Sequence, residues 1–194
     1  MKLILASKSP RRKEILKKAG YDFKIIPSTI EFDIVGKSYE ENLLKECAKS
    51  KAIDVFNIIK NEPVENEDVL IIASDTIVVN KNIIIGKPKD RLDAISILKS
   101  LSGNTHFVET GIYLIKIDSK NITEEKYASE KTYVTFRELT SKEIENYIDD
   151  KKPFDKAGAY GIQDDGFDFV EKINGNIDNV MGFPLTTFEN LKNL

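Results

Sequence analysis

The first twelve residues change abruptly from a buried strand to a helix, and this change constrains the fold more than any other segment. Lys2-Leu-Ile-Leu-Ala6 is an apolar run of strand length. Ser9 then provides a helix N-cap, and Pro10 occupies the first helical position, where proline is tolerated. Such a turn directs free backbone N–H groups and the positive end of the helix dipole to one place. We therefore expect an α/β chain with an anion-binding turn near its start.

The side chains at this turn strengthen the expectation of an anion. Ser7 and Ser9 add hydroxyls, and Arg11 and Arg12 add guanidiniums that bind phosphate oxygens in a bidentate, planar way. Cations are misplaced at a helix N-terminus unless an anion meets them there. We therefore favour a phosphate site over the alternative, a basic first turn that is merely solvated.

Composition limits the chemistry that this chain can perform. It has 194 residues, of which 41% are hydrophobic, and no break in composition, so we expect residues 1–194 to form a single domain. Cys47 is the only cysteine and reads as core, while His106, the only histidine, is given no role. Disulfides, zinc sites rich in Cys or His, and Ser-His-Asp catalysis are therefore poor fits, and carboxylates, lysines, arginines and a hard metal remain.

The charge and the apolar segments limit the partners. A net charge of −3 argues against binding to a nucleic acid polymer. No stretch is apolar enough for a membrane span, and none resembles a signal peptide. Together with the low cysteine content, these features lead us to expect a cytoplasmic protein.

The spacing of apolar residues predicts alternating strands and helices. We expect helices over about 10–19, 38–59, 90–101 and 140–149 and from 184, and strands over about 23–26, 69–79, 83–85, 106–117, 125–136 and 167–173. Capping boxes, Ser38-Tyr-Glu-Glu41 and Thr140-Ser-Lys-Glu143, open two of these helices. The pattern predicts an α/β unit with a mixed sheet flanked by helices.

Two charged residues lie where apolar residues are expected. Asp75 falls within the apolar strand 69–79, and an ionised carboxylate there needs a metal, a lysine or an arginine. Lys51 lies in the apolar stripe of the helix 38–59, so it either reaches the edge of that stripe or points into a cleft. We favour a functional role for Asp75 over a structural ion pair or a position in a loop.

Three further segments carry candidate residues. Lys87 follows the strand 83–85 in a rigid turn, which would present its ammonium group. Glu31 and Asp33 follow another strand and could supply a carboxylate to a metal. The segment 155–163 is rich in glycine and alanine, which permits close approach of a ligand, and it ends at Gln163, whose amide can read the edge of a base.

These motifs, taken in order, resemble the Maf family. They are Leu5-Ala-Ser-Lys-Ser-Pro-Arg-Arg12, Ala73-Ser-Asp-Thr76, Gly86-Lys-Pro88, Leu101-Ser-Gly103 and the segment 155–163. Members of that family are nucleoside triphosphate pyrophosphatases named for septum formation, and the last motif resembles the subgroup that prefers dTTP and UTP. The resemblance implies the fold of the Maf/ITPase type, an elongated mixed sheet with two lobes around a central cleft.

The resemblance also implies a role for individual residues. Asp75 matches the catalytic acid of the family, which is assigned as the proton acceptor. Arg11, Thr76 and Gln163 match positions that govern substrate choice. The polar and basic residues that match the lining of the phosphate site are Ser7, Arg12, Lys51 and Lys87.

A divalent cofactor, Mg²⁺ or Mn²⁺, and a homodimer are implied in the same way. Asp75 would hold the metal with Glu31, or with Asp33 as the alternative, because Phe32 separates two acids that are adjacent in many family members. A second departure is Asp164-Asp165, which stands where the family usually continues with glycine. We expect hydrolysis between the α and β phosphates. Clean-up of purine or modified triphosphates is one rival, and a regulator of cell division that only binds nucleotides is another.

Overall fold

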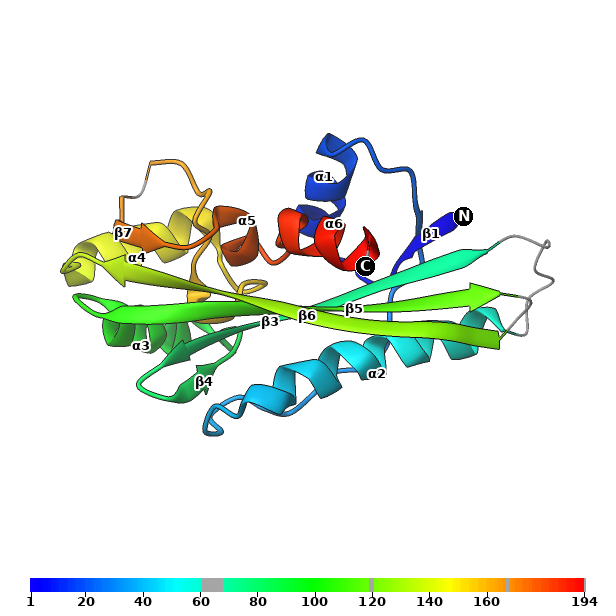
Figure 1. Cartoon of the computed structure of the whole chain (residues 1–194). Coiled ribbons are helices and arrows are strands. Elements are labelled where there is room, and N and C mark those ends of the chain that lie inside the picture. Colours follow the sequence, from blue (N-terminus) through cyan, green and yellow to red (C-terminus); the bar gives the residue numbers. More distant parts are fainter. Residues whose placement is uncertain (61–67, 119–120, 167, 194) are drawn as a thin grey trace.

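A seven-stranded mixed sheet runs through the molecule, with helices on both of its faces (Figure 1). The computed structural model describes residues 1–60, 68–118, 121–166 and 168–193. The strands are β1 (Lys2–Leu5), β2 (Lys24–Ile25), β3 (Val69–Asn80), β4 (Ile83–Ile85), β5 (Thr105–Asp118), β6 (Asn121–Phe136) and β7 (Val170–Asn174). The helices are α1 (Pro10–Lys18), α2 (Glu41–Ile59), α3 (Arg91–Leu101), α4 (Ser141–Lys151), α5 (Ile177–Val180) and α6 (Leu185–Asn193), with a 3₁₀ turn η1 (Ala157–Ala159).

The order of the strands is β2-β1-β3-β5-β6-β7, and β4 pairs separately with β3. β1 runs parallel to both of its neighbours, whereas the other pairs are antiparallel. The long strands β3, β5 and β6 give the sheet its elongated form (Figure 1). The predicted α/β class and the mixed sheet are confirmed.

Alternate residues of β3 serve two different cores. Leu70 and Ile72 face α1 and α6, while Ile71 and Ala73 face α2. Side chains alternate between the faces of a strand, so an apolar run without alternation is the pattern of a strand covered on both sides. The position of α2 against one face and of α1 and α6 against the other is visible in Figure 1.

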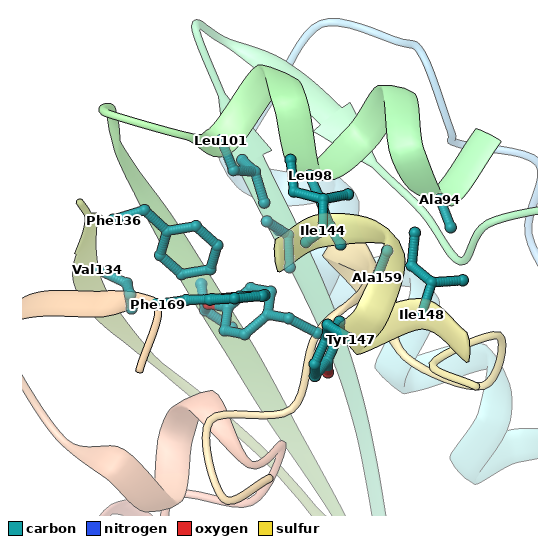
Figure 2. Packing of buried hydrophobic residues seen from close by; sticks show 13 residues of the cluster. Ala94, Leu98, Leu101, Val134, Phe136, Ile144, Tyr147, Ile148, Ala159 and Phe169 are labelled. Carbon is teal, nitrogen blue, oxygen red and sulfur yellow. The ribbon is translucent and has the colours of Figure 1, made fainter. Parts of the chain in front are cut away.

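The other end of the sheet has a core of its own, built around Phe136. Leu98 and Leu101 of α3 and Ile144 and Tyr147 of α4 pack together there (Figure 2). These side chains are all 1% exposed or less. The sheet therefore connects two packed regions, one on α1, α2 and α6 and one on α3 and α4.

Three of the predicted helix starts are confirmed by their caps. Ser9, Asp90 and Thr140 each accept a hydrogen bond from a backbone N–H in the first turn of the helix that follows. The capping box predicted at Ser38 is wrong, because α2 begins at Glu41 after the N-cap Glu40, which makes no side-chain cap hydrogen bond.

The physical reason is a long-range strand contact. Ser38 forms a β-bridge with Ile83, and Tyr39 N–H donates to Asn82 O at 2.9 Å. Residues 38 and 39 are therefore paired with the segment 82–83, and the helix cannot start until this pairing has ended.

The last strand is shorter than predicted. β7 begins at Val170, and Phe167, where the sequence prediction starts, lies outside the described residues. Among the helices that the structure describes, none combines the length and apolarity needed to cross a membrane.

Candidate functional site

An uncovered stretch of strand edge in the middle of β3 borders a pocket. β1 pairs with this edge as far as Ile72, whose partner is Leu5, and β4 pairs with it again from Val78, whose partner is Ile85. Within the described part of the chain, residues 73–77 have no named strand on this edge. The pocket has a volume of about 420 Å³, which is in the size range of small-molecule sites.

Nine of the ten residues proposed from the sequence line this pocket. They are Ser7, Arg11, Arg12, Glu31, Lys51, Asp75, Thr76, Lys87 and Gln163. They come from the turn after β1, the first turn of α1, the segment after β2, α2, β3, the turn after β4 and the segment after η1. The tenth, Asp33, is exposed and is not among the lining residues.

Asp75 and Lys51 form an ion pair inside the pocket. Lys51 Nζ donates to Asp75 Oδ1 at 2.7 Å, and the same oxygen accepts from Thr76 N–H at 3.1 Å. The two side chains are only 19% and 17% exposed. Of the alternatives open from the sequence, Lys51 points into the cleft, and Asp75 lies within β3, opposite Gly111 of β5.

Cys47 packs one helical turn before Lys51 and is fully buried. Burial, followed by the charge of Asp75, raises the pKa of this thiol to about 11. The thiol is therefore protonated at neutral pH and belongs to the core, as expected.

Arg12 joins three distant segments beside Asp75. Its guanidinium donates to Gly182 O at 2.9 Å, to Ser74 O at 2.7 Å, to Ser7 Oγ at 3.2 Å and to Thr76 Oγ1 at 3.1 Å. Burial, as the largest effect, lowers the pKa of the guanidinium, but arginine stays charged in proteins. Arg12 therefore orients neighbouring groups, and most of its donors are already used.

The hydroxyl of Thr76 is oriented by a chain of hydrogen bonds. Thr110 Oγ1 donates to Asn179 O at 2.9 Å, so its own proton is committed there. Thr76 Oγ1 lies 2.9 Å from Thr110 Oγ1 and must supply the proton of that contact. Since Arg12 donates to the same oxygen, Thr76 can offer a ligand only a remaining lone pair.

Arg11 reaches across the pocket to the segment before η1. Its Nη1 lies 3.1 Å from Asp155 Oδ2, and Lys156 Nζ lies 3.1 Å from Asp155 Oδ1. Burial acts to raise the pKa of Asp155, but Lys156 and Arg11 outweigh it and hold the pKa below its ordinary value. This ion pair is accessible enough for an incoming anion to compete with Asp155 for Arg11.

Gln163 and Lys87 occupy exposed positions on the pocket lining. Gln163 is a central residue of a β-turn in which Asp164 N–H donates to Gly161 O at 3.0 Å. Lys87 follows Gly86, whose carbonyl accepts from Gly158 N–H of η1 at 3.0 Å. The turn after β4 and the segment 157–163 therefore hold each other in place.

The carboxylates of the pocket suit a hard divalent cation. Asp75 and Glu31 both line it, and Mg²⁺ is commonly held by one or two carboxylates together with substrate phosphates. In the described ranges, no group of three or more His, Cys, Asp and Glu side chains could hold a metal unaided. The residues present thus fit a metal that arrives with a phosphate ligand.

Sequence reasoning missed four residues that support the pocket. Asp155 and Lys156 were signalled only as part of a motif. His106, 2% exposed, has Nε2 2.9 Å from the hydroxyl of Tyr160, which lines the pocket. Asn179, fully buried, bonds to both neighbouring strands, with its side chain reaching Thr110 N, Val108 O and Thr132 Oγ1. His106 and Asn179 could have been identified only from their burial, which a sequence does not show.

Comparison with known proteins shows similarity over nearly the whole chain. The sequence profile described as "Maf-like protein" matches residues 2–193. A dTTP/UTP pyrophosphatase of Acetivibrio thermocellus is 45% identical, with 98% of this chain and 94% of that protein covered. Proteins with the same name from Clostridium perfringens and Aquifex aeolicus are 44% and 41% identical, each over 95% of this chain and over 92% and 90% of their own lengths.

Among solved structures, the Ham1 protein of Staphylococcus aureus aligns with a TM-score of 0.46 at 14% identity. The alignment covers 100% of this chain and 95% of that one.

Proposed function

The chain belongs to the Maf family, and from this premise we propose that it is a nucleoside triphosphate pyrophosphatase that prefers dTTP and UTP. The oxygen of a water molecule attacks the α-phosphorus, and the bond from that phosphorus to the α–β bridging oxygen breaks. The products are the nucleoside monophosphate and pyrophosphate, and the water gives up a proton. The observation that carries the proposal is the convergence of one paired carboxylate and several cations on the pocket at the open edge of β3.

The cations of the pocket account for binding of a triphosphate. Arg11, Lys51 and Lys87 line it, and α1 begins there, with Ser9, Pro10 and Arg11 among the lining residues. A helix start and fixed cations stabilise the charge that develops on a leaving pyrophosphate. The first turn of α1 has no acidic residue, so a bound phosphate group would also offset the positive end of the helix dipole there.

Asp75 is the residue we assign to the chemical step. Its carboxylate lines the pocket, and Lys51 Nζ and Thr76 N–H both donate to one of its oxygens, Oδ1. Two roles fit this carboxylate, acceptance of the proton from water or coordination of a metal. Mg²⁺ or Mn²⁺, held by Asp75 and Glu31, would supply Lewis-acid polarisation of a phosphate oxygen or of water.

We propose that Gln163 reads the base. Its side-chain amide carries donors and an acceptor, it lines the pocket, and it follows a segment in which Gly158 adopts a φ of +75°. Names of relatives at 41–45% identity support the choice of dTTP and UTP.

We further propose that residues 1–194 form one domain, since one sheet connects their two packed regions, and that the protein acts as a homodimer. Sedimentation analysis tests the second statement: a single species with the mass of one 22.0 kDa chain would contradict it.

The test of the activity is pyrophosphate release from a panel of nucleoside triphosphates with Mg²⁺ or Mn²⁺. Selective turnover of dTTP and UTP is expected. Equal turnover of purine triphosphates would contradict the proposed preference but not the reaction. Nucleotide binding without turnover in either metal would contradict the reaction and favour a regulator that only binds.

A further inference from the structure

One phenol holds both ends of the β-turn that carries Gln163. The Tyr147 hydroxyl, from α4, accepts from Gly161 N–H at 2.9 Å and donates to Asp164 Oδ2 at 2.7 Å. Gly161 and Asp164 are the first and last residues of the turn, which their backbones also close at 3.0 Å. A phenol has one proton and can accept as well as donate, so both bonds form together.

The Tyr147 ring is a fixed point for this turn. It is 1% exposed and packs in the core of α3 and α4 beside Ile148 (Figure 2), with its centroid 4.9 Å from that of Phe169. Burial, followed by the hydrogen bond to Asp164, raises the pKa of the phenol well above its ordinary value. The hydroxyl therefore keeps its proton and remains a donor at neutral pH.

Asp164 closes the turn from the opposite side. Its carboxyl lies against Gly161, where a Cβ would be only 2.7 Å from it. Its side chain is 14% exposed, with Lys156 Nζ 3.9 Å away. Gly161, Ile162 and Gln163 line the pocket, whereas Asp164 is not among the lining residues. Its carboxylate therefore contacts Tyr147 of α4 and Lys156 and is not part of the pocket lining.

This contact depends on the side chain of Asp164. The resemblance described above implies glycine at this position, and glycine has no oxygen that could accept from Tyr147. We propose that Asp164 is a positioning residue for base selection, which holds Gln163 in one place through Tyr147. The proposal rests on the function proposed above.

The physical reason is that an amide discriminates between bases only when its donors and acceptor are fixed. An amide on a loose turn adjusts to several base edges, whereas a fixed amide leaves mismatched polar groups without partners. Asp75, Lys51 and Arg12 lie on other elements, so loss of the contact should affect substrate choice more than the chemical step.

The test compares Asp164→Ala and Asp164→Asn, with Asp165→Ala as the matched control because Asp165 is the exposed neighbouring acid. For each variant, kcat and KM are measured with dTTP, UTP, CTP and dGTP. For Asp164→Ala we expect the ratio of kcat/KM for dTTP to that for dGTP to fall on the order of tenfold, which corresponds to about 1.4 kcal/mol. The fall should come mainly from KM for dTTP.

Asp164→Asn separates positioning from charge. Asparagine keeps an oxygen that accepts from Tyr147 but carries no charge, so we expect it to retain most of the selectivity. Equal losses in the Asn and Ala variants would overturn the proposal, and so would an unchanged ratio in Asp164→Ala or an equal loss in Asp165→Ala.

Tyr147→Phe provides a second route to the same contact. It removes both hydrogen bonds and keeps the ring, so we expect the same loss of selectivity, with little further loss in the double variant with Asp164→Ala. Fully additive losses would overturn the proposal. If the unaltered protein releases no pyrophosphate, the proposed function fails as well. If the unaltered protein is selective and Asp164→Ala has the same ratio of kcat/KM values, only this inference fails.

Discussion

The ammonium of Lys51 on α2 lies 2.7 Å from the carboxylate of Asp75 on β3, in a pocket where each side chain is less than one-fifth exposed. The pair joins the helix on one face of the sheet to the open edge of its long strand. A carboxylate so placed keeps its charge compensated while it lines the pocket, which is what either proposed role of Asp75 requires.

The first prediction concerns Asp75. Asp75→Asn removes the charge but keeps the shape, so we expect turnover to fall by roughly 10²–10⁴-fold, the usual contribution of a general base. Affinity for a non-hydrolysable triphosphate should be unchanged or higher, because repulsion between the carboxylate and the phosphates is lost. Steady-state kinetics and calorimetry measure these two quantities. Full turnover in this variant would remove Asp75 from the mechanism.

The second prediction separates the two adjacent arginines. Arg12→Lys cannot reproduce four hydrogen bonds that reach three segments, so the free energy of unfolding should fall by about 2–4 kcal/mol. Arg11 makes one partly exposed ion pair, so Arg11→Ala should change stability by less than about 1 kcal/mol.

Substrate binding should depend on Arg11 more than its stability effect suggests. Arg11→Ala should raise KM for dTTP and weaken the base preference, because Arg11 is free to leave Asp155 for a phosphate. Urea unfolding and steady-state kinetics on both variants check the pair of predictions. An Arg11→Ala enzyme with an unaltered substrate profile would contradict the role given to Arg11.

The third prediction concerns the metal. Chelation should abolish turnover, and Mg²⁺ or Mn²⁺ should restore it. Glu31→Gln should raise the Mg²⁺ concentration needed for half-maximal activity by on the order of tenfold, because Glu31 lines the pocket with Asp75. Asp33→Asn is the matched control and should behave as the unaltered protein. The opposite result would assign the metal to the alternative acid.

The fourth prediction concerns stability in mild acid. Burial lowers the pKa of His106 to about 4, against about 6.5 in an unfolded chain. Above pH 6.5 the residue is neutral in both states and has no effect. As the pH falls from 6.5 to 4, the unfolded chain binds a proton that the folded chain does not, so stability is lost, in total by about 3 kcal/mol.

His106→Gln should remove this pH dependence. The variant starts from a lower stability at pH 7, because it alters the contact with Tyr160, but its loss between pH 7 and pH 5 should be smaller by about 2 kcal/mol. Urea unfolding at the two pH values measures the difference. Parallel losses in both proteins would show that His106 is protonated in the folded state.

Features set by neighbouring residues could be predicted from the sequence. The cap at Ser9 and the box at Thr140 depend on contacts within a few residues, and the strand around Asp75 shows in the sequence as a continuous apolar run. The cap at Ser38 failed because pairing with Ile83, 45 positions away, extends the chain there. Local patterns also indicated Lys51 and Asp75 as unusual, but not that they are partners.

Positioning residues were the least predictable part of the site. His106 and Asn179 look ordinary in the sequence, and only the fold shows them buried against Tyr160 and Thr110. Asp164 was singled out from the sequence only as a departure from the family pattern, whereas the structure shows its side chain bonded to Tyr147. Which way a loop carboxylate faces is decided by tertiary contacts that have no local signature.

The bond from Arg12 to Gly182 spans 170 positions, and this separation has a consequence for biosynthesis. A chain that has just left the ribosome as far as β3 already contains Arg12, Lys51 and Asp75, yet the carbonyl that completes the Arg12 contacts is still to be made. Non-local contacts of this kind form late, since the chain between them must be closed first. A nascent or C-terminally truncated chain would therefore contain Asp75 but lack the contact between Arg12 and Gly182 O. The site would be complete, and able to hydrolyse a substrate, only after the final segment has been synthesised.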